Sequence, residues 1–195
     1  TDGKVIANTQ KVLELKNEIE VFEFENITAK PVPSLLRDFS APVKLKTKFT
    51  DADLQFLLMH DEDGFNRWDA GQQLAARVIL GNKNSSQVIV DAFRYLLNEN
   101  IADHAFLAEL LILPGEIYLG EQMPVIDVDA IHQARHALRK ELAKQLQQEF
   151  LTIYKKYAGV AYANDAQSIA NRRLKNVCLS YLMLLNNAEI TALCL

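Results

Sequence analysis

The sequence contains few cysteines, no long apolar run and no excess of positive charge. Cys178 and Cys194 are the only cysteines, and Cys178 falls in an apolar helical stretch, which predicts a small buried thiol in a reducing compartment rather than a bridge. The most apolar segment, 177–185, is about half the ~18 residues that a bilayer span requires, so no membrane insertion is expected. The 21 basic and 25 acidic residues give a formal net charge of −4, which argues against a nucleic-acid partner.

The rest of the composition is that of a globular protein. Hydrophobic residues make up 49% of the chain and charged residues 24%, which are ordinary proportions. A chain of 195 residues is long enough for one or two domains and can bury about 70% of the surface that its unfolded form exposes. We therefore expect it to fold without disulfides or a structural metal.

Proline is scarce but concentrated in one segment. Three of the five prolines, Pro31, Pro33 and Pro42, fall within residues 30–45, KPVPSLLRDFSAPVKL. Proline fixes its own φ, biases the preceding residue toward extended backbone and cannot donate a ladder hydrogen bond. This segment is therefore predicted to be a stiff extended connector, where the chain changes from strands to helices.

The first 48 residues carry the pattern of short β-strands. Residues 11–25, KVLELKNEIEVFEFE, alternate apolar and polar positions, as strands with one buried face do. A break at residues 16–18 predicts a hairpin turn, and further short strands are expected at 4–7 and 42–48. Residues 1–48 are thus predicted to form a partial antiparallel β-sandwich domain. Because a sandwich needs a second sheet, this half is expected either to pack on the helical part or to pair with another copy of itself.

From Thr50 onward the apolar spacing is that of helices. Thr50 and Asp53 form a capping-box pattern, and the longest candidate helix, 128–157, carries apolar residues at three- and four-residue spacing. Short loops indicate antiparallel neighbours, so residues 49–195 are predicted to be an all-α domain stacked as an α-solenoid. The expected helices span about 50–60, 65–80, 85–98, 102–113, 128–157 and 165–185, with a short turn at 116–122 and a last helix from about 188. The predicted fold class is mainly α with a small β part.

Several segments resemble a known family. The proline segment, followed by FNRWDAGQQLAARVI at 65–79, is similar in wording and order to the region of bacterial aminopeptidase N where a small β domain meets a C-terminal helical domain. The resemblance implies that this chain is a piece of a larger zinc aminopeptidase. The similarity continues through DAFRYLLNENI at 91–101, ELLILPG at 109–115, VIDVDAIHQARHALRKELA at 125–143 and IANRRLKNVCLSYL at 169–182.

The resemblance also implies a function. The parent enzyme would remove N-terminal amino acids from peptides in the bacterial cytoplasm, using a zinc-activated water and a glutamate general base. In the family, the zinc ligands and this glutamate belong to an earlier thermolysin-like domain that the sequence lacks. We therefore expect no catalytic, cofactor-binding or metal-binding residue here. The fragment would pack on the catalytic domain and cap the active-site cleft, and would be inactive by itself.

His132 and His136 lie four residues apart on one predicted helix, where they could share a zinc ion. The catalytic motif of the family needs glutamate after the first histidine, where this sequence has Gln133. Its third ligand should follow nineteen residues after the second histidine, where this sequence has Lys155. Neighbouring Arg135 would also repel a dication. These residues are therefore predicted to be a solvated histidine pair.

Two other groups of candidate ligands have ordinary interpretations. His60 and His104 lack a cluster of ligands at metal spacing and are predicted to be surface or helix-capping groups. The acidic stretch at 61–63 lacks the alternating oxygens of a calcium loop and is predicted to be a solvated turn.

Trp68, the only tryptophan, is the best candidate for a contact between domains. It is flanked by Arg67 and Asp69, and such a polar frame around an indole is typical of domain junctions, although simple core packing explains it equally well. The resemblance adds that Arg37 and Phe39 should pack near this helix and lock the β domain to the helical one.

Two other functions are open. The chain could be a free-standing helical-repeat scaffold that binds partner proteins on a concave face. That hypothesis has to explain the unfinished sheet and the final apolar run ITALCL, which is typical of a cut end. A metallohydrolase built on His132 and His136 is opposed by the ligand arguments above.

Overall fold

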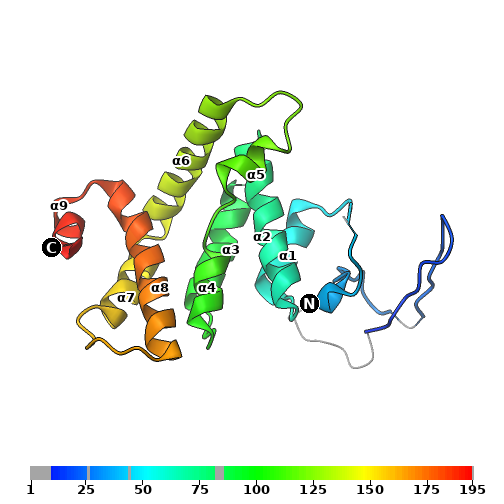
Figure 1. The fold of residues 1–195 in the computed structure, drawn as a ribbon, viewed down its shortest axis with the longest axis horizontal. Helices are drawn as coiled ribbons and strands as arrows, with labels where there is room; N and C mark the ends of the chain where they lie inside the picture. Colours follow the sequence, from blue (N-terminus) through cyan, green and yellow to red (C-terminus); the bar gives the residue numbers. More distant parts are fainter. Residues whose placement is uncertain (1–9, 26, 44, 82–85, 195) are drawn as a thin grey trace. The chain divides into compact units, whose positions relative to one another are not determined.

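The structure is a computed structural model that describes residues 10–25, 27–43, 45–81 and 86–194. The chain separates into two units, residues 1–33 and 34–195, which are described one at a time. All of the helices found among these described residues belong to the second unit (Figure 1). They are α1 (Asp51–His60), α2 (Gly64–Ile79), α3 (Ser86–Asn98), α4 (His104–Leu110), α5 (Glu116–Gly120), α6 (Val128–Gln145), α7 (Gln147–Tyr157), α8 (Ala166–Leu182) and α9 (Ala188–Thr191), with 3-10 turns η1 (Arg37–Phe39), η3 (Met183–Leu185) and η4 (Ala192–Cys194).

The described part of the first unit has no regular secondary structure. The chain bends at residues 17–19, and the Glu20 carboxylate accepts hydrogen bonds there from the Lys16 N–H, at 2.9 Å, and from Asn17 Nδ2, at 2.7 Å. The apolar side chains on either side of the bend face solvent, with Val12 87% and Val21 80% exposed. The bend thus lies within one residue of the predicted turn, without the flanking strands.

The expected strands within 11–25 and 42–48 are not formed in the part of the chain that the structure describes, and the expected strand at 4–7 lies outside it. The alternating pattern shows which face a sheet would bury, but it does not supply the partner strand. A strand is stable only when its N–H and C=O groups are paired, and an isolated hairpin is marginal in water. The small β part of the predicted fold is therefore not seen.

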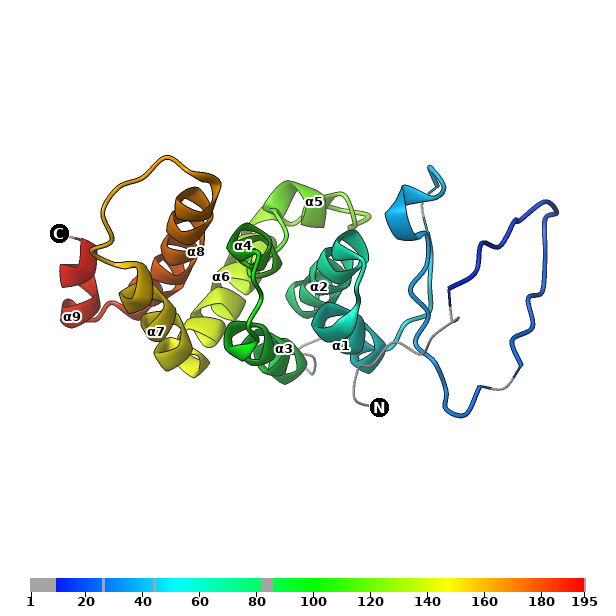
Figure 2. The same ribbon diagram turned by 90° about the horizontal axis from the view of Figure 1, so that it is seen from below.

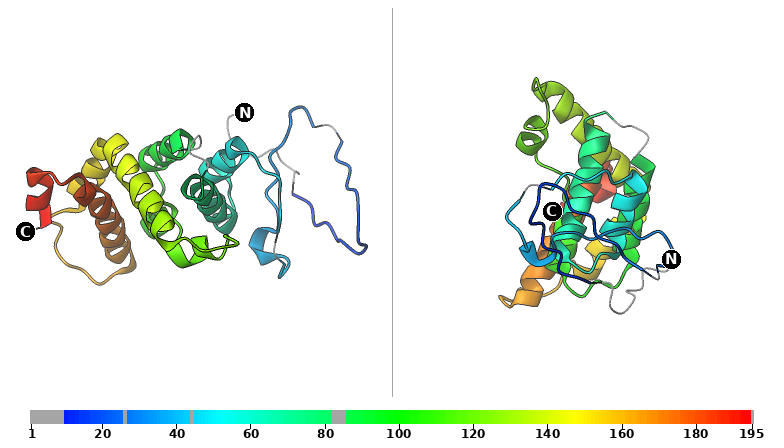
Figure 3. Two further views of the ribbon diagram at one scale, coloured as in Figure 1. Left: turned by 90° about the horizontal axis from the view of Figure 1, so that it is seen from above. Right: turned by 90° about the vertical axis from the view of Figure 1, so that its right-hand side faces the viewer.

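The second unit is an array of antiparallel helices in two rows. Helices α1, α3 and α7 follow one another along one side, and α2, α4 and α8 along the other (Figure 2). Helix α6 runs across the array and contacts α2, α3 and α8 (Figure 3, left). The expectation of a stacked helical array is confirmed. None of the described helices is long and apolar enough to cross a membrane.

Helix starts follow the capping residues in the sequence. The Thr50 hydroxyl accepts from the Asp53 N–H at 3.1 Å, and Asp53 Oδ2 accepts from the Thr50 N–H at 2.8 Å, which confirms the capping box. An aspartate side chain caps each of α2, α4, α6 and α8 in the same way, by accepting a hydrogen bond from a backbone N–H in the first turn. Local side-chain chemistry therefore sets these boundaries.

The prediction of one helix over 128–157 is wrong. The helix breaks at Leu146, whose φ of −117° and ψ of 21° are not helical, so that α6 and α7 are separate. Leu146 itself keeps its backbone hydrogen bonds, because its N–H donates to the Leu142 carbonyl at 2.9 Å and its carbonyl accepts from the Phe150 N–H at 3.0 Å. Both Leu146 and Phe150 are fully buried, so the apolar periodicity continues across the break and hides it in the sequence.

The core between α4, α7 and α8 surrounds a pair of stacked rings. Phe150 and Tyr181 lie 4.7 Å apart between centroids, and the Tyr181 hydroxyl donates to the Leu111 carbonyl at 2.6 Å. Cys178 is buried on the same helix as Tyr181 and forms no disulfide, as predicted. Burial raises the pKa of its thiol to about 12, so it is packed as a small apolar group.

Candidate functional site

Residues 34–43, here called the 34–43 segment, adopt a strained conformation. Leu36, Asp38 and Phe39 all have φ close to 55°, in the left-handed region. Each such residue costs about 1–2 kcal/mol unless it is glycine. Backbone of this kind persists only where its surroundings hold it in place, and it is often found at functional positions. The contacts that hold this segment define the candidate site.

Asp63 makes the central contact. It caps α2 by accepting from the Asn66 N–H at 2.9 Å, and its other oxygen accepts from the N–H of Asp38, one of the left-handed residues, at 2.9 Å. Burial alone would raise the pKa of this carboxyl. The two N–H groups outweigh burial, with help from nearby Arg37, and hold the pKa of Asp63 below its ordinary value. One carboxylate therefore starts a helix and secures the segment.

Asp61 lies at the end of α1 and is buried, with 8% of its surface exposed. Its Oδ1 accepts from the Asp63 N–H at 2.9 Å and lies 3.5 Å from the Arg37 guanidinium. Its Oδ2 is buried and has no hydrogen-bond partner among the described residues. The prediction of a solvated acidic turn is thus wrong at Asp61, because Arg37 approaches from a distant part of the sequence and covers it.

Aromatic rings and an amide complete the contact. The Phe39 ring packs on Phe65, with centroids 4.6 Å apart, and Phe65 packs on Trp68 at 5.7 Å. The Asn66 side-chain amide donates to Ser34 Oγ at 3.0 Å and to the Leu35 carbonyl at 2.9 Å. Trp68 is half-buried, so it lies at the edge of the helical core rather than inside it.

Arg67 faces inward, toward the end of α1. Its Nε donates to the Leu58 carbonyl at 2.8 Å, and its Nη2 donates to the Met59 carbonyl at 2.9 Å. The same nitrogen lies 2.6 Å from Glu99 Oε2, just after α3. A guanidinium at this position donates hydrogen bonds to carbonyls that have no partner within the helix, and its positive charge is stabilised by the negative end of the helix dipole. Arg67 therefore joins α1, α2 and α3.

Asp69 points toward α5. Its Oδ2 accepts from Gln73 at 2.7 Å, and its charge adds to burial in raising the pKa of Tyr118. Of the predicted set, Phe39 is linked to Trp68 through the Phe65 ring, and Arg37 pairs instead with Asp61. Arg67 and Asp69 make their contacts elsewhere, with the end of α1 and with Gln73. Sequence reasoning missed Asp63 and Asn66, although an aspartate three residues before an asparagine, next to an apolar run, is a recognisable helix start.

A shallow open groove of about 550 Å³ lies near the same end of α1. Its ionic groups already have partners, since Glu99 pairs with Arg67 and Arg94 pairs with Glu149 at 3.1 Å. His60 adjoins the groove and meets the Tyr95 ring edge to face, with ring centroids 5.0 Å apart. Burial lowers the pKa of His60, Glu99 opposes this, and Arg67 reinforces it. The charged side chains that line the groove are therefore already paired and do not select a charged ligand. The groove is lined by Met59, Asp91, Arg94, Tyr95, Asn98 and Glu99.

His132 and His136 lie side by side on α6, and His132 also contacts Glu116 of α5. His132 Nδ1 lies 3.0 Å from Glu116, and its ring is parallel to that of His136, with the centroids 6.5 Å apart. No cluster of three or more metal-binding side chains occurs within the described ranges. His104, expected to be a surface or capping group, instead bridges helices, with Nδ1 2.5 Å from Asn171 and its ring 5.4 Å from Tyr157.

The lowered pKa of Asp63 predicts a pH dependence. A carboxyl whose pKa is lower in the folded state stabilises that state above its unfolded pKa of about 3.9, and this stabilisation is lost as the pH falls through the folded value. We expect the free energy of unfolding to fall more steeply between pH 5 and pH 3 in the wild type than in Asp63→Asn, which can still cap α2. Urea titrations at each pH would measure both slopes, and equal slopes would contradict the role of this carboxylate.

Comparison with known proteins identifies the family to which this chain belongs. Residues 51–195 match the family described as a domain of unknown function (DUF3458_C) with ARM repeats. The chain belongs to this family. Residues 1–48 match a second family, described as a domain of unknown function (DUF3458) with an Ig-like fold. The DUF3458_C match thus begins with the first residue of α1.

The DUF3458_C chain is similar to curated proteins named Aminopeptidase N. It is 38% identical to the Escherichia coli protein over 93% of this chain, 35% identical to the Haemophilus influenzae protein over 90%, and 34% identical to the Caulobacter vibrioides protein over 96%. These matches cover only 21–22% of the length of each relative. The resemblance to bacterial aminopeptidase N found in the sequence is confirmed.

A solved structure agrees with the sequence relatives. Legionella pneumophila aminopeptidase A, in a crystal structure with aspartic acid, has a TM-score of 0.77 and 31% identity over 88% of the DUF3458_C chain. Again the match covers only 22% of that protein. The helical array is therefore one that also occurs within a much longer aminopeptidase.

Proposed function

We propose that this chain is a non-catalytic part of a zinc-dependent bacterial aminopeptidase that removes N-terminal amino acids from peptides. The observation that carries the proposal is the 34–38% identity to Aminopeptidase N over at least 90% of this chain, in a match that covers about a fifth of each relative. The sequence has glutamine where the zinc motif requires glutamate after His132. The zinc ligands and the general base would thus lie elsewhere in the parent polypeptide, by which we mean the longer protein encoded by the same gene.

The proposed role of this part is architectural. The helical array would support the catalytic part and cap its cleft, so that peptides enter by their free ends. The strained 34–43 segment supports this role, because Asp63, Asn66 and Phe65 together hold it in one conformation at the start of α2. Arg37 and Phe39 would thereby hold residues 34–43 against the start of α2.

We also propose a division into two domains, 1–48 and 49–195, with the proline-rich connector at the end of the first. The two family matches, which end at 48 and begin at 51, support this division. The Ig-like description of residues 1–48 supports the view that the strand pattern of 11–25 forms a sheet when its partner strands are present. A bacterial cytoplasmic location is proposed on the buried free thiol of Cys178.

An assay of two purified proteins tests the function. The parent polypeptide and the 195-residue chain would each be incubated with an alanine chromogenic anilide, before and after treatment with a zinc chelator. We expect the parent to release the chromophore and to lose that activity on chelation, because the water-activating groups lie in its other part. The 195-residue chain is expected to release none above the buffer rate.

Two outcomes would overturn the proposal. The first outcome is a parent polypeptide that is folded and contains zinc but releases no chromophore. It would contradict the aminopeptidase function and favour a helical scaffold. The second outcome is release of the chromophore by the 195-residue chain itself. If His132→Ala abolishes this release and the exposed control Lys140→Ala keeps it, the catalytic site lies within this chain.

A further inference from the structure

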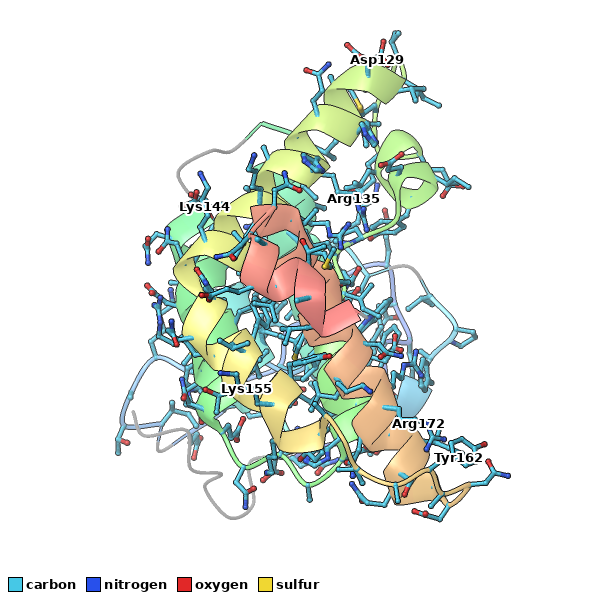
Figure 4. All side chains as sticks on the ribbon, turned by 90° about the vertical axis from the view of Figure 1, so that its left-hand side faces the viewer. Asp129, Arg135, Lys144, Lys155, Tyr162 and Arg172 are labelled. Atoms are coloured by element: carbon cyan, nitrogen blue, oxygen red, sulfur yellow. The ribbon has the colours of Figure 1, made fainter. Side chains whose placement is uncertain are left out.

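The corner between α5 and α6 exposes a group of large apolar side chains. Ile117 is 83% exposed, Val125 81% and Val128 65%, with Tyr118 and Ile126 also exposed. We call these five residues the α5–α6 corner. Apolar side chains gathered in this way are rare on soluble monomers and mark interaction surfaces. Asp129, in the first turn of α6, lies beyond the ends of the other helices of this unit, so nothing described in the unit covers the corner (Figure 4).

The corner is held in place by the fold. Other residues of the same segments, Leu119 and Ile131, are buried and fill the core. The exposed apolar residues are therefore not used in packing within this unit. Arg135, farther along α6, donates to the Pro114 carbonyl at 2.7 Å and ties the start of α5 to α6. A Cβ on Gly120 would lie only 3.3 Å from Ile126, which shows how closely α5 meets the start of α6. The exposed side chains therefore cannot simply turn inward.

The exposed charged side chains next to the apolar residues are all acidic. The sequence has no lysine or arginine from Tyr95 to Ala134. Glu121, Asp127 and Asp129 are exposed beside the apolar residues and form no ion pair with a described residue. Two copies meeting through this same face would bring carboxylates together, because such a contact is self-complementary. Like charges placed together across an interface cost several kcal/mol, so the charge pattern selects against a second copy.

We propose that the α5–α6 corner docks on another part of the same parent polypeptide, outside these 195 residues, where apolar side chains are rimmed by lysine or arginine. This inference rests on the proposed function, under which most of the parent lies outside this chain. The match to the Escherichia coli relative, which takes up 93% of this chain and only 22% of that protein, leaves ample polypeptide to supply the partner surface. The basic rim would meet Glu121, Asp127 and Asp129, and the apolar residues would be desolvated between them.

Photo-crosslinking in the intact parent tests the docking. A benzophenone amino acid would replace Val125, and, as a matched control, Val160 in the loop between α7 and α8, which is 64% exposed. After irradiation, peptide mapping would identify the partner. We expect Val125 to crosslink within the monomer to a peptide outside this chain that is flanked by lysine or arginine, with several-fold higher yield than Val160.

The other outcomes overturn the docking. A covalent dimer would identify a second copy as the occupant, and crosslinks to residues 1–33 would identify this chain's own N-terminal unit. Equal yields at the two positions would show an uncovered surface. The anilide assay on the same preparation separates the two proposals, because an active parent without the crosslink refutes only the docking, whereas a crosslinked but inactive parent refutes only the aminopeptidase function.

Discussion

Phe150→Ala is expected to lower the free energy of unfolding of the helical unit by about 3–5 kcal/mol, the usual cost of removing a fully buried phenylalanine side chain. Phe150 is 0% exposed and lies 4.7 Å from the Tyr181 ring, with the two planes 3° apart. The substitution removes the stacked ring and leaves a cavity between α7 and α8. Close-packed neighbours collapse only partly into such a space, which makes the loss large.

Urea unfolding of the 195-residue chain, followed by circular dichroism, measures the loss. The matched control is Phe24→Ala, because Phe24 is 53% exposed in the described part of the first unit. We expect the control to change the free energy of unfolding by less than about 0.5 kcal/mol, as for other surface substitutions. A loss in Phe150→Ala no larger than that of the control would show that α7 and α8 are not packed as described.

The helices could be predicted from the sequence because their signals are local. Thr50 with Asp53, and the aspartates before α2, α4, α6 and α8, accept hydrogen bonds within one turn of their own position. The break at Leu146 could not be predicted in this way. Leu146 keeps its own two backbone hydrogen bonds, and the apolar spacing continues across it, so no residue type marks the break.

The candidate site was only partly predictable. Phe39 and Arg37 were assigned to the neighbourhood of α2, and the structure places them on Phe65 and Asp61. The burial of Asp61 could not be read from its own segment, because the groups that cover it arrive from more than twenty residues away. The inward direction of Arg67 has the same origin, since its partner Glu99 follows 32 residues later.

The prediction of strands in residues 11–25 and 42–48 failed for a related reason. Alternation in 11–25 indicates which side chains a sheet would bury, but strand pairing is a contact over long sequence distance that this pattern does not encode. The match of residues 1–48 to an Ig-like family agrees with the pattern, whereas the described residues stay unpaired. Local patterns therefore gave the helices, and contacts over long sequence distance decided the rest.

Arg67→Met is expected to lower the free energy of unfolding by about 2–3 kcal/mol, the upper part of the range of about 1.5–3 kcal/mol for hydrogen bonds made by a charged group. Arg67 is largely buried, with 12% of its side chain exposed, and methionine keeps most of its apolar contacts. The substitution leaves two carbonyls at the end of α1 and the Glu99 carboxylate without their donor. Because Glu99 is 33% exposed, water will recover part of that loss, which keeps the expected value below that of a fully buried pair.

Arg94→Met is the matched control, since Arg94 pairs with Glu149 while 39% of its side chain is exposed, and its loss should stay below about 1 kcal/mol. Arg67→Lys keeps the charge but cannot hold the forked geometry, so we expect it to recover less than half of the loss in Arg67→Met. Urea titrations of these variants and of the double variant with Glu99→Gln would separate the carboxylate contact from the carbonyl contacts. If Arg67→Met and Arg94→Met lose the same small amount, Arg67 does not join the first three helices, and the packing that supports the start of α2 must come from its apolar face alone.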